Sequence, residues 1–401
     1  MEEALSDVTV LDLGQVIAMP FCTMLLADLG ARVIKVESRE RGRERLSLGI
    51  KRVRNGVEER VAPAQYRERN KLAVTLELKT PKGVELFKEL VSRADVVAEN
   101  FSVGTMERLG LGYEDLKAVN PRIIYASVTA FGQHGPYAMQ RGYDILAQAI
   151  SGYLSITGFP ENPPTKSGQS ISDYYAGMLC AFSIVSALHY RNRTGHGQRI
   201  DMALLDSLVV ALDNLGERYT VGGEILSRAG NVSFAGSATG IYPAADGLVA
   251  VAASASNAIW ARFCAVIGRD ELTRDPAFAT AAARRDRRDE IAAIIQGWTG
   301  TRPKAEIVRV LSGAGVPAAP DNNVAEMVAD PQVQAREMFV AREHPVYGRL
   351  LTTGSPLKLS ETPGRVRWLA PMPGEHNEDV FVGLLGHSRD DLARWRADGV
   401  I

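Results

Sequence analysis

Residues 8–37 read VTVLDLGQVIAMPFCTMLLADLGARVIKVE, and this stretch decides the fold class. Its two ends are short runs rich in valine and isoleucine, Val8–Leu13 and Arg32–Glu37, which predict β-strands. The apolar segment between them opens a helix at Pro20 and stops at Gly30. A strand, a helix and a second strand over so short a distance form a βαβ unit, which makes the two strands parallel.

The same alternation continues along the first half of the chain. Four further apolar runs predict strands at Leu72–Leu78, Asp95–Asn100, Ile123–Thr129 and Arg199–Leu205. A helix is expected to start at Thr80-Pro81, between the first two of these runs. Strands that alternate with helices predict a doubly wound α/β sheet. At 401 residues, the chain is long enough for two domains of ordinary size.

Composition limits the classes of function. The hydrophobic fraction of 46% and the charged fraction of 23% are typical of a globular protein, and the net charge of −1 argues against a general nucleic-acid or membrane-surface binder. Cys22, Cys180 and Cys264 lie in separate apolar runs and are expected to be reduced core residues. The acidic start, Met1–Asp7, does not resemble a signal peptide, and no apolar run is expected to reach the length of a membrane span, so we expect a cytoplasmic protein.

A nicotinamide-dependent enzyme is the first alternative for such a fold. Glu37 closes the second strand, where an acid that binds ribose would lie. However, the turn after the first strand holds the single glycine Gly14 and no G-x-G-x-x-G motif. The Gly110–Gly112 pair follows a short helix instead of a strand. The phosphate-binding turn of that class is therefore missing.

The segment Arg39–Lys71 carries an unusual charge. It holds eleven lysines and arginines against five acids, a local balance of +6 in a nearly neutral protein. A solvated loop is the usual structure of such a run. The segment nevertheless follows the carboxyl end of a strand, where α/β proteins bind ligands, which favours a docking site for a small polyanion.

One carboxylate lies in a setting that suits chemistry. The stretch Pro163–Gly177 reads PPTKSGQSISDYYAG and places Asp173 between Gly168 and Gly177, just before the apolar run Met178–Leu188. That run predicts a buried helix, with Asp173 at its N-cap or in its first turn, where backbone N–H groups favour the ionised form. The glycines would let a ligand approach the backbone. Such a carboxylate could be a nucleophile, and an ordinary helix cap is the alternative.

Several phrases, in order along nearly the whole chain, resemble the class III coenzyme A (CoA) transferases. They are Val33–Glu37, Arg69–Lys71, Leu78–Gly83, Glu99–Phe101, Glu107–Tyr113, Asn120–Arg122, Phe131–Pro136, the Asp173 stretch, Thr194–Gln198 and Gly374–His376. The resemblance implies an interlocked homodimer, with a Rossmann-like large domain and a smaller α+β domain in each subunit. It places the first part of the large domain at residues 1–220, the linker and small domain at 221–330, and a return to the large domain at 331–401.

The resemblance also implies a mechanism. Asp173 matches the family's catalytic aspartate, which attacks the thioester of an acyl-CoA and passes through anhydride and aspartyl-CoA intermediates. The CoA thioester is a substrate, and no tightly bound cofactor is expected. The matching positions for CoA binding are Val16, Ala18, Arg39, Lys71, Leu72, Asn100, Phe101 and Arg108. The six histidines show no metal-ligand spacing, so no metal site is expected.

Two related reactions are weighed against the sequence. In the 2-methylacyl-CoA racemases of the family a histidine precedes an aspartate, whereas this chain reads Gly142-Tyr143-Asp144, and no acid occurs in Ala253–Asn257. Formyl-CoA transferases carry a glutamine where this chain has Ile17, and a run of four glycines where it has Phe234–Gly240. By analogy with the family, the resemblance implies CoA transfer from succinyl-CoA to a dicarboxylate or a substituted succinate. A racemase and a non-catalytic CoA-binding subunit stay open as alternatives.

Overall fold

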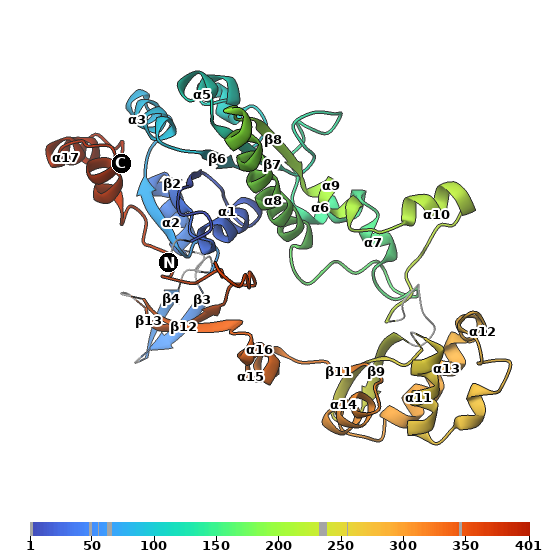
Figure 1. The fold of residues 1–401 in the computed structure, drawn as a ribbon. Helices are drawn as coiled ribbons and strands as arrows, with labels where there is room; N and C mark the ends of the chain where they lie inside the picture. Colours follow the sequence, from blue (N-terminus) through green and yellow to red (C-terminus); the bar gives the residue numbers. More distant parts are fainter. Residues whose placement is uncertain are drawn as a thin grey trace. The chain divides into compact units, whose positions relative to one another are not determined.

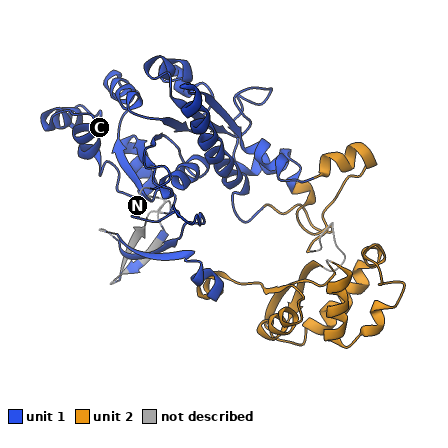
Figure 2. Ribbon diagram, in the orientation of Figure 1, with its two compact units in different colours: residues 1–153, 167–213, 331–401 blue, residues 154–166, 214–330 orange. Residues whose placement is uncertain are grey.

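The structure is a computed structural model that describes residues 3–47, 50–54, 56–61, 66–231, 239–254, 256–344 and 347–401. The chain forms two compact units (Figure 2). Unit 1 comprises residues 1–153, 167–213 and 331–401, and unit 2 comprises residues 154–166 and 214–330. The division differs from the expected one because 154–166 and 214–220 belong to unit 2. The backbone N–H of Gly230 donates to the Gly158 carbonyl at 2.9 Å, which ties the first of these segments to unit 2.

Unit 1 is built on a parallel sheet of six strands (Figure 1). In spatial order the strands are β5 (Lys71–Thr75), β2 (Arg32–Glu37), β1 (Thr9–Asp12), β6 (Val96–Glu99), β7 (Ile124–Thr129) and β8 (Arg199–Ala203). Counted within the sheet, this order is 3-2-1-4-5-6, the order of the dinucleotide-binding folds. The prediction of a parallel α/β sheet is confirmed, and each predicted strand is present to within a few residues.

The order of the strands reverses between β1 and β6, which are neighbours in space but not in sequence. From this point the chain proceeds outward in both directions, and the loops after β1 and β6 lie next to each other at the carboxyl ends of the two strands. Doubly wound proteins bind their ligands at such a switch point, beyond the carboxyl ends of the strands. The loop after β1 leads into helix α1 (Ala18–Asp28), and the loop after β6 begins at Asn100.

Both faces of the sheet are buried. Helices α1 and α8 (Ile171–Thr194) cover one face, where Val10, Val96 and Ile124 point. The other face is covered by α3 (Pro81–Ser92), α5 (Tyr113–Val119), the π-helix η2 (Glu378–Leu384) and α17 (Arg389–Ala397). The last two elements come from the third piece of unit 1. The C-terminal segment therefore completes a core that the N-terminal strands begin.

The 24-residue helix α8 is by length and composition alone able to cross a membrane, which corrects the expectation that no apolar segment reaches that length. A buried core helix passes the same test. Cys180, Ile184 and Leu188 of α8 do belong to the core of unit 1. The three cysteines of the chain are buried and form no disulfide, as expected.

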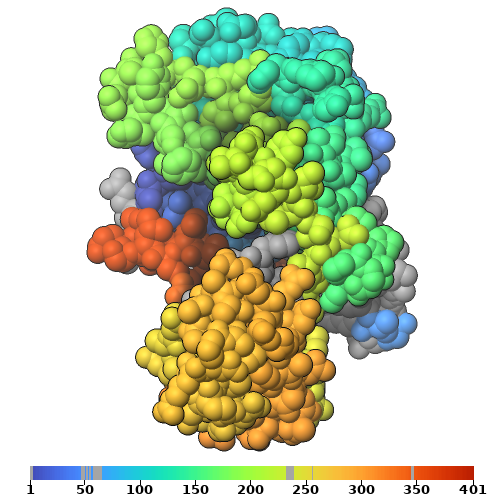
Figure 3. All heavy atoms as spheres, turned by 90° about the vertical axis from the view of Figure 1, so that its right-hand side faces the viewer, coloured from blue at the N-terminus to red at the C-terminus, as the bar shows by residue number. Residues whose placement is uncertain are grey.

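Unit 2 has its own sheet and core. Its antiparallel strands are β11 (Ala318–Pro320), β10 (Gly247–Ala252) and β9 (Thr239–Ala244). Helices α11 (Asn257–Ile267), α13 (Arg288–Thr299) and α14 (Lys304–Gly313) supply core side chains around Trp260 and Phe263. In the space-filling view, the yellow and orange residues of this unit gather into one body (Figure 3).

The remaining elements are short. They are α2 (Arg39–Ser47), β3 (Ile50–Arg54), β4 (Val57–Val61), α4 (Thr105–Arg108), α6 (Asp144–Ile150), α7 (Tyr153–Ile156), α9 (Leu204–Val210), α10 (Leu215–Gly222), η1 (Asp270–Thr273), α12 (Ala281–Asp286), α15 (Val324–Ala329), α16 (Pro331–Ala335), β12 (Phe339–His344) and β13 (Gly348–Thr353). The cationic segment Arg39–Lys71, for which a solvated loop was the alternative to a docking site, contains the helix α2 and the β3–β4 hairpin.

Candidate active site

Asp173 lies in the first turn of α8, as predicted, and Ser170 occupies the N-cap position. The carboxylate of Asp173 accepts a hydrogen bond from the backbone N–H of Ala18. Ala18 is the first residue of α1, which follows β1 at the switch point. The N-terminus of α1, a position where doubly wound folds hold phosphates, therefore faces a protein carboxylate.

Gly177 brings the two helices together. It lies one turn after Asp173 on the same face of α8. A Cβ atom at Gly177 would stand 2.6 Å from the Ala18 carbonyl oxygen and 3.1 Å from Cδ1 of Phe21. The absence of a side chain thus permits α1 to approach α8. Both glycines were expected to let a ligand approach the backbone, and for Gly177 this is wrong, because the space beside it is filled by α1. The space beside Gly168 is open, since no atom lies within 4 Å of a Cβ placed there.

The environment of Asp173 makes its carboxylate basic. Burial, followed by the nearby charge of Asp144, raises the pKa of Asp173 to about 6, although the Ala18 N–H and the Arg67 charge lower it. The N–H that favours the ionised form belongs to Ala18 in α1 and not to α8, the helix expected to supply it, and desolvation outweighs its effect. At neutral pH the group is still mostly ionised, and it is a stronger nucleophile than an ordinary carboxylate.

Asp144 organises the start of α8. Its Oδ1 accepts hydrogen bonds from the backbone N–H and the hydroxyl of Ser172 at 2.9 and 2.7 Å. Its Oδ2 accepts from Nε2 of Gln148 at 2.6 Å. The bond to Gln148 fixes the Asp144 carboxylate, and the two bonds from Ser172 fix the residue before Asp173. Tyr143, which stands in place of the racemase histidine, is exposed.

An aromatic and cationic group adjoins Asp173. The hydroxyls of Tyr174 and Tyr66 share a hydrogen bond, and Nη1 of Arg67 donates to the Tyr66 hydroxyl at 3.1 Å. The Tyr174 ring meets the Phe21 ring edge-on, with 5.0 Å between centroids. Through these contacts, α1 and the segment before β5 both enclose the first turn of α8.

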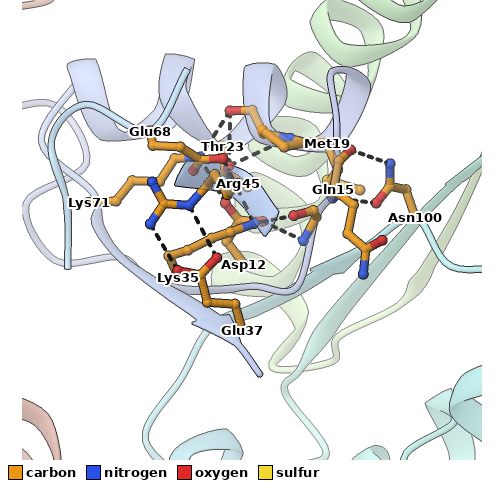
Figure 4. Close-up of polar contacts among 12 residues, drawn as sticks. Asp12, Gln15, Met19, Thr23, Lys35, Glu37, Arg45, Glu68, Lys71 and Asn100 are labelled. Carbon is orange, nitrogen blue, oxygen red and sulfur yellow. Dashed lines mark hydrogen bonds and ion pairs between the residues drawn. The ribbon is translucent and has the colours of Figure 1, made fainter. Parts of the chain in front are cut away.

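The loop after β1 is clamped from the other side of the switch point (Figure 4). The amide of Asn100 accepts from the Gln15 N–H at 2.7 Å and donates to the Gln15 carbonyl at 2.9 Å. The next residue, Val16, has φ of 62° and is 72% exposed. A β-branched residue in the left-handed region is strained by roughly 1–3 kcal/mol. The Asn100 side chain holds the residue before Val16, and Val16 lies two residues before Ala18.

An ion network lies beneath this loop. Nζ of Lys71 is 2.8 Å from both Asp12 Oδ2 and Glu68 Oε2, and Nζ of Lys35 is 3.6 Å from Asp12 Oδ1 (Figure 4). Burial favours a neutral Glu68, but Lys35 and Lys71 hold the pKa of that carboxyl at about 2. Lys71 is completely buried. Its ammonium is therefore paired with Asp12 and Glu68 inside the protein and is not exposed to a phosphate of a ligand.

Other members of the cationic segment are paired in the same way. Arg45 bonds Glu37 at 2.9 Å, so the carboxylate expected in a ribose-binding enzyme is already engaged. The Arg69 guanidinium bonds both oxygens of Asp28, at 2.9 and 2.6 Å. Asn70, with φ of 61°, accepts from the backbone of the C-terminal segment near Trp368. The segment Arg69–Lys71 therefore holds parts of unit 1 together and is used for structure.

The other predicted CoA contacts are distributed over unit 1. Arg39 is exposed, donates to the Arg396 carbonyl at 3.0 Å and lines a cavity of about 280 Å³. Leu72 lines a second cavity, of about 270 Å³. The Phe101 N–H donates to Glu99 at 2.7 Å, and the exposed Arg108 donates to Thr105.

Hydrogen bonds link Asp173 with Ala18 and, through the loop after β1, with Asn100. No bond between described residues connects Arg39, Leu72 or Arg108 to that group. Sequence reasoning missed the positions of Arg67, Tyr174 and Asp144 as neighbours of Asp173. The only available signal was that Tyr174 is adjacent to Asp173 in sequence.

Some expectations fall outside the described residues. Most of Phe234–Gly240, namely 234–238, belongs to the part of the chain that is not described, as does Ala255. Within the described ranges, no group of three or more His, Cys, Asp or Glu side chains is arranged to hold a metal ion.

Comparisons with known proteins cover nearly the whole chain. The sequence profile of CoA-transferase family III matches residues 5–377. The succinyl-CoA–D-citramalate CoA-transferase of Chloroflexus aurantiacus is 38% identical over 397 residues, covering 99% of this chain and 98% of that protein. The succinate–glutarate CoA-transferase of Agrobacterium fabrum is 37% identical over 382 residues, with 95% of each chain covered. A CAIB/BAIF family protein from Brucella suis has a similar structure, with a TM-score of 0.84, 34% identity, and coverage of 96% of this chain and 100% of that one.

Proposed function

Because this chain belongs to CoA-transferase family III, we propose that it transfers CoA from succinyl-CoA to a dicarboxylic acid through the carboxylate of Asp173. The observation that carries this proposal is the setting of that carboxylate. It lies at the switch point of the sheet, partly withdrawn from water, with a pKa raised to about 6 and a backbone N–H directed at it.

The reaction divides into four acyl transfers. A carboxylate oxygen of Asp173 attacks the thioester carbon, the carbon–sulfur bond breaks, and CoA leaves as a thiolate from a mixed anhydride. The thiolate attacks the aspartyl carbonyl and releases the donor acid as a carboxylate, which leaves an aspartyl-CoA thioester. The acceptor carboxylate then attacks this thioester and expels the thiolate. The thiolate finally attacks the acceptor's acyl carbon, which forms the new CoA ester and restores Asp173.

The residues around Asp173 assist these steps in distinct ways. Desolvation makes the carboxylate more reactive and limits the access of water, which would hydrolyse an anhydride. The Ala18 N–H is already aimed at a carboxylate oxygen. When that oxygen gains charge in a tetrahedral intermediate, the same donor stabilises it. Asp144 fixes the helix start from which Asp173 projects.

For the CoA portion, we propose a groove that starts at the switch point. Val16 and Ala18 lie in and just after the loop that follows β1, and Asn100 and Phe101 lie in the loop that follows β6. Arg39 and Arg108 are exposed cations suited to phosphate oxygens, and Leu72 adds apolar surface. Lys71 supports this groove from below through its buried ion pairs, without reaching the ligand.

The choice of substrates rests on relatives. The names of three relatives state succinyl-CoA, with D-citramalate, mesaconate or L-malate as the second substrate, and a fourth name pairs succinate with glutarate. All of these acids carry two carboxylates. A relative 35% identical is named formyl-CoA:oxalate CoA-transferase. Its acceptor is also a dicarboxylate, so the class of acceptor is common to these relatives.

A second copy of this chain is the proposed partner. Helices α6, α8 and α9 contact one another in unit 1 and carry a group of exposed apolar side chains. These are Ile145, Leu146, Ile150, Met178, Phe182, Val185, Val209 and Val210. An apolar surface of this kind marks an interface. We expect a dimer in light scattering and a monomer after Phe182→Asp; a monomeric unaltered protein at micromolar concentration would contradict the proposal.

The nucleophile is tested by trapping. The protein is incubated with succinyl-CoA, treated with hydroxylamine and digested, and the peptide containing Asp173 is examined by mass spectrometry. We expect a hydroxamate on Asp173 and a loss of transfer in Asp173→Asn. Asp390→Asn, which alters an exposed acid in the first turn of α17, serves as the matched control and should keep full activity. Transfer that survives Asp173→Asn would refute the assignment.

A further inference from the structure

Arg67 lies beside the proposed nucleophile with most of its hydrogen-bonding capacity unused. Its side chain is half-buried, and Nη1 donates to the Tyr66 hydroxyl at 3.1 Å. Its Nε is buried and has no hydrogen-bond partner among the described residues. The guanidinium lies over the Tyr66 ring, 5.0 Å from the centroid. One bond to a phenol is a small share of the five donors of this group.

Other arginines buried in unit 1 are paired with acids. Arg45 bonds Glu37 at 2.9 Å and Arg69 bonds Asp28 at 2.6 Å. Arg191 in α8 bonds Asp95 at 2.7 Å. Arg67 forms no ion pair with any carboxylate in the part of the chain that the structure describes. A charge partly removed from water without a counter-ion is unfavourable unless an anion joins it.

The position of Arg67 is fixed relative to Asp173. The Tyr66 hydroxyl, which accepts from Arg67, is also bonded to the hydroxyl of Tyr174, the residue after Asp173. Burial and the bond to Tyr174 raise the pKa of Tyr66 to about 12, so this phenol stays neutral and leaves the guanidinium charge uncompensated. The field of Arg67 reaches Asp173, where it favours the ionised form. The two groups nevertheless form no ion pair, which leaves the carboxylate free to attack.

We propose that Arg67 binds the second carboxylate of the diacid substrate, the one that does not exchange CoA. The inference rests on the proposed function and specifies how the site recognises its acids. A guanidinium binds a carboxylate through two parallel N–H···O bonds, which adds orientation to charge. The donor acid leaves before the acceptor acid reacts, so one guanidinium serves the free carboxylate of succinyl-CoA and that of the acceptor in turn.

The test is an internal competition. Glutarate and butyrate, a dicarboxylate and a monocarboxylate, compete at equal concentration for succinyl-CoA, and chromatography measures the ratio of the two CoA esters formed. This ratio depends only on the second half of the reaction, because both acids react with the same aspartyl-CoA intermediate. Arg67→Met removes the charge and keeps a long side chain. Arg67→Lys keeps the charge but loses the planar group that forms two parallel hydrogen bonds with a carboxylate. Arg41→Met alters an exposed arginine paired with Glu44 and is the control.

We expect Arg67→Met to lower the ratio of glutaryl-CoA to butyryl-CoA by about ten- to a hundredfold, the loss typical of hydrogen bonds to a charged group. Arg67→Lys should lie between Arg67→Met and the unaltered protein, and Arg41→Met should leave the ratio unchanged. An unchanged ratio in Arg67→Met overturns the inference. This includes the case in which the amounts of both CoA esters decrease equally, which would mean that Arg67 binds a CoA phosphate or stabilises the fold. Trapping of Asp173 in that variant would show that the proposed function survives.

A second measurement uses the unaltered protein and does not depend on folding of the variants. Phenylglyoxal modifies accessible arginines, and mass spectrometry follows the peptide that contains Arg67. Glutarate should protect this peptide and butyrate should not. Equal protection by both acids, or none by either, would contradict the assignment.

Discussion

Replacing Gly177 by alanine should change the acidity of a side chain one helical turn away. The added Cβ would stand 2.6 Å from the Ala18 carbonyl oxygen, and ordinary contact begins at 3.4 Å, so α1 must retreat by roughly 0.8 Å. The N–H that bonds Asp173 belongs to the same residue and moves with it. A hydrogen bond to a charged group is worth about 1.5–3 kcal/mol, which corresponds to about one to two pKa units.

We therefore expect the pKa of Asp173 to rise from about 6 toward about 7–8 in Gly177→Ala. The nucleophile must be ionised, so activity declines as the pH falls through this pKa, and the acid limb of kcat/KM shifts upward by the same amount. The assay is the pH dependence of kcat/KM for succinyl-CoA. Gly168→Ala is the control from the same stretch, because a Cβ there meets nothing within 4 Å, and its profile should match that of the unaltered protein.

The two effects of the substitution can be separated. Overpacking alone costs about 1–3 kcal/mol of stability and lowers the melting temperature without touching the pH profile. If Gly177→Ala melts earlier but keeps its acid limb near the original pH, the Ala18 N–H does not set the acidity of Asp173, and the reasoning is refuted.

Four further substitutions, one of them added to another, test other parts of the site. The pKa of Asp173 in the folded protein is about 6, above the ordinary value of 3.8, so the folded protein loses stability as the pH rises from about 4 to about 6. Asp173→Asn removes this loss. The variant should therefore be more stable than the unaltered protein by up to about 3 kcal/mol at pH 8 and equally stable near pH 3, which melting curves measure. Lys71→Met leaves Asp12 and Glu68 short of a buried partner and should destabilise the protein by about 3–5 kcal/mol in denaturant titrations; unchanged stability with a raised KM for the CoA ester would instead support direct contact with CoA. Asn100→Ala frees the backbone before Val16 and should lower kcat/KM roughly tenfold, the effect of about 1.4 kcal/mol. Adding Val16→Gly should recover part of this loss, because glycine adopts the left-handed conformation without strain; no recovery would show that the clamp acts otherwise.

The fold could be predicted because buried parallel strands are continuous apolar runs. The runs around Val33 and Val96 have both faces covered, and each was visible without knowledge of its neighbours. The order of the strands could not be predicted in this way. The pairing of β1 with both β2 and β6 depends on crossovers that composition does not encode.

The sequence predicted which types of residue belong to the candidate site, but not which residues contact one another there. Asp173 was recognisable from its position before an apolar helix, but its pKa is raised by burial and by Asp144 and lowered by Ala18, and both of these residues are distant in sequence. Lys71 and Arg69 look like ligand-binding cations in the sequence. Their acids, among them Asp12 and Asp28, are brought to them only by the fold.

The same limit applies to Gly177 and Arg67. A glycine beside a reactive group can admit a ligand or a neighbouring helix, and sequence alone does not distinguish the two. Arg67 was one of eleven cations in a single segment. Its distinction is that its neighbours leave it unpaired, which is a property of three-dimensional packing.

The division of unit 1 into three pieces affects its biosynthesis. Phe381, Leu392 and Trp395 cover one face of a sheet whose last strand ends at Ala203. At about 5–20 residues per second, a ribosome needs roughly ten to forty seconds to proceed from the end of that sheet to Trp395. Throughout this interval α3 and α5 can cover part of that face, but the apolar part that η2 and α17 cover stays exposed. Recombinant yield should therefore depend on chaperones that hold this face until translation is complete.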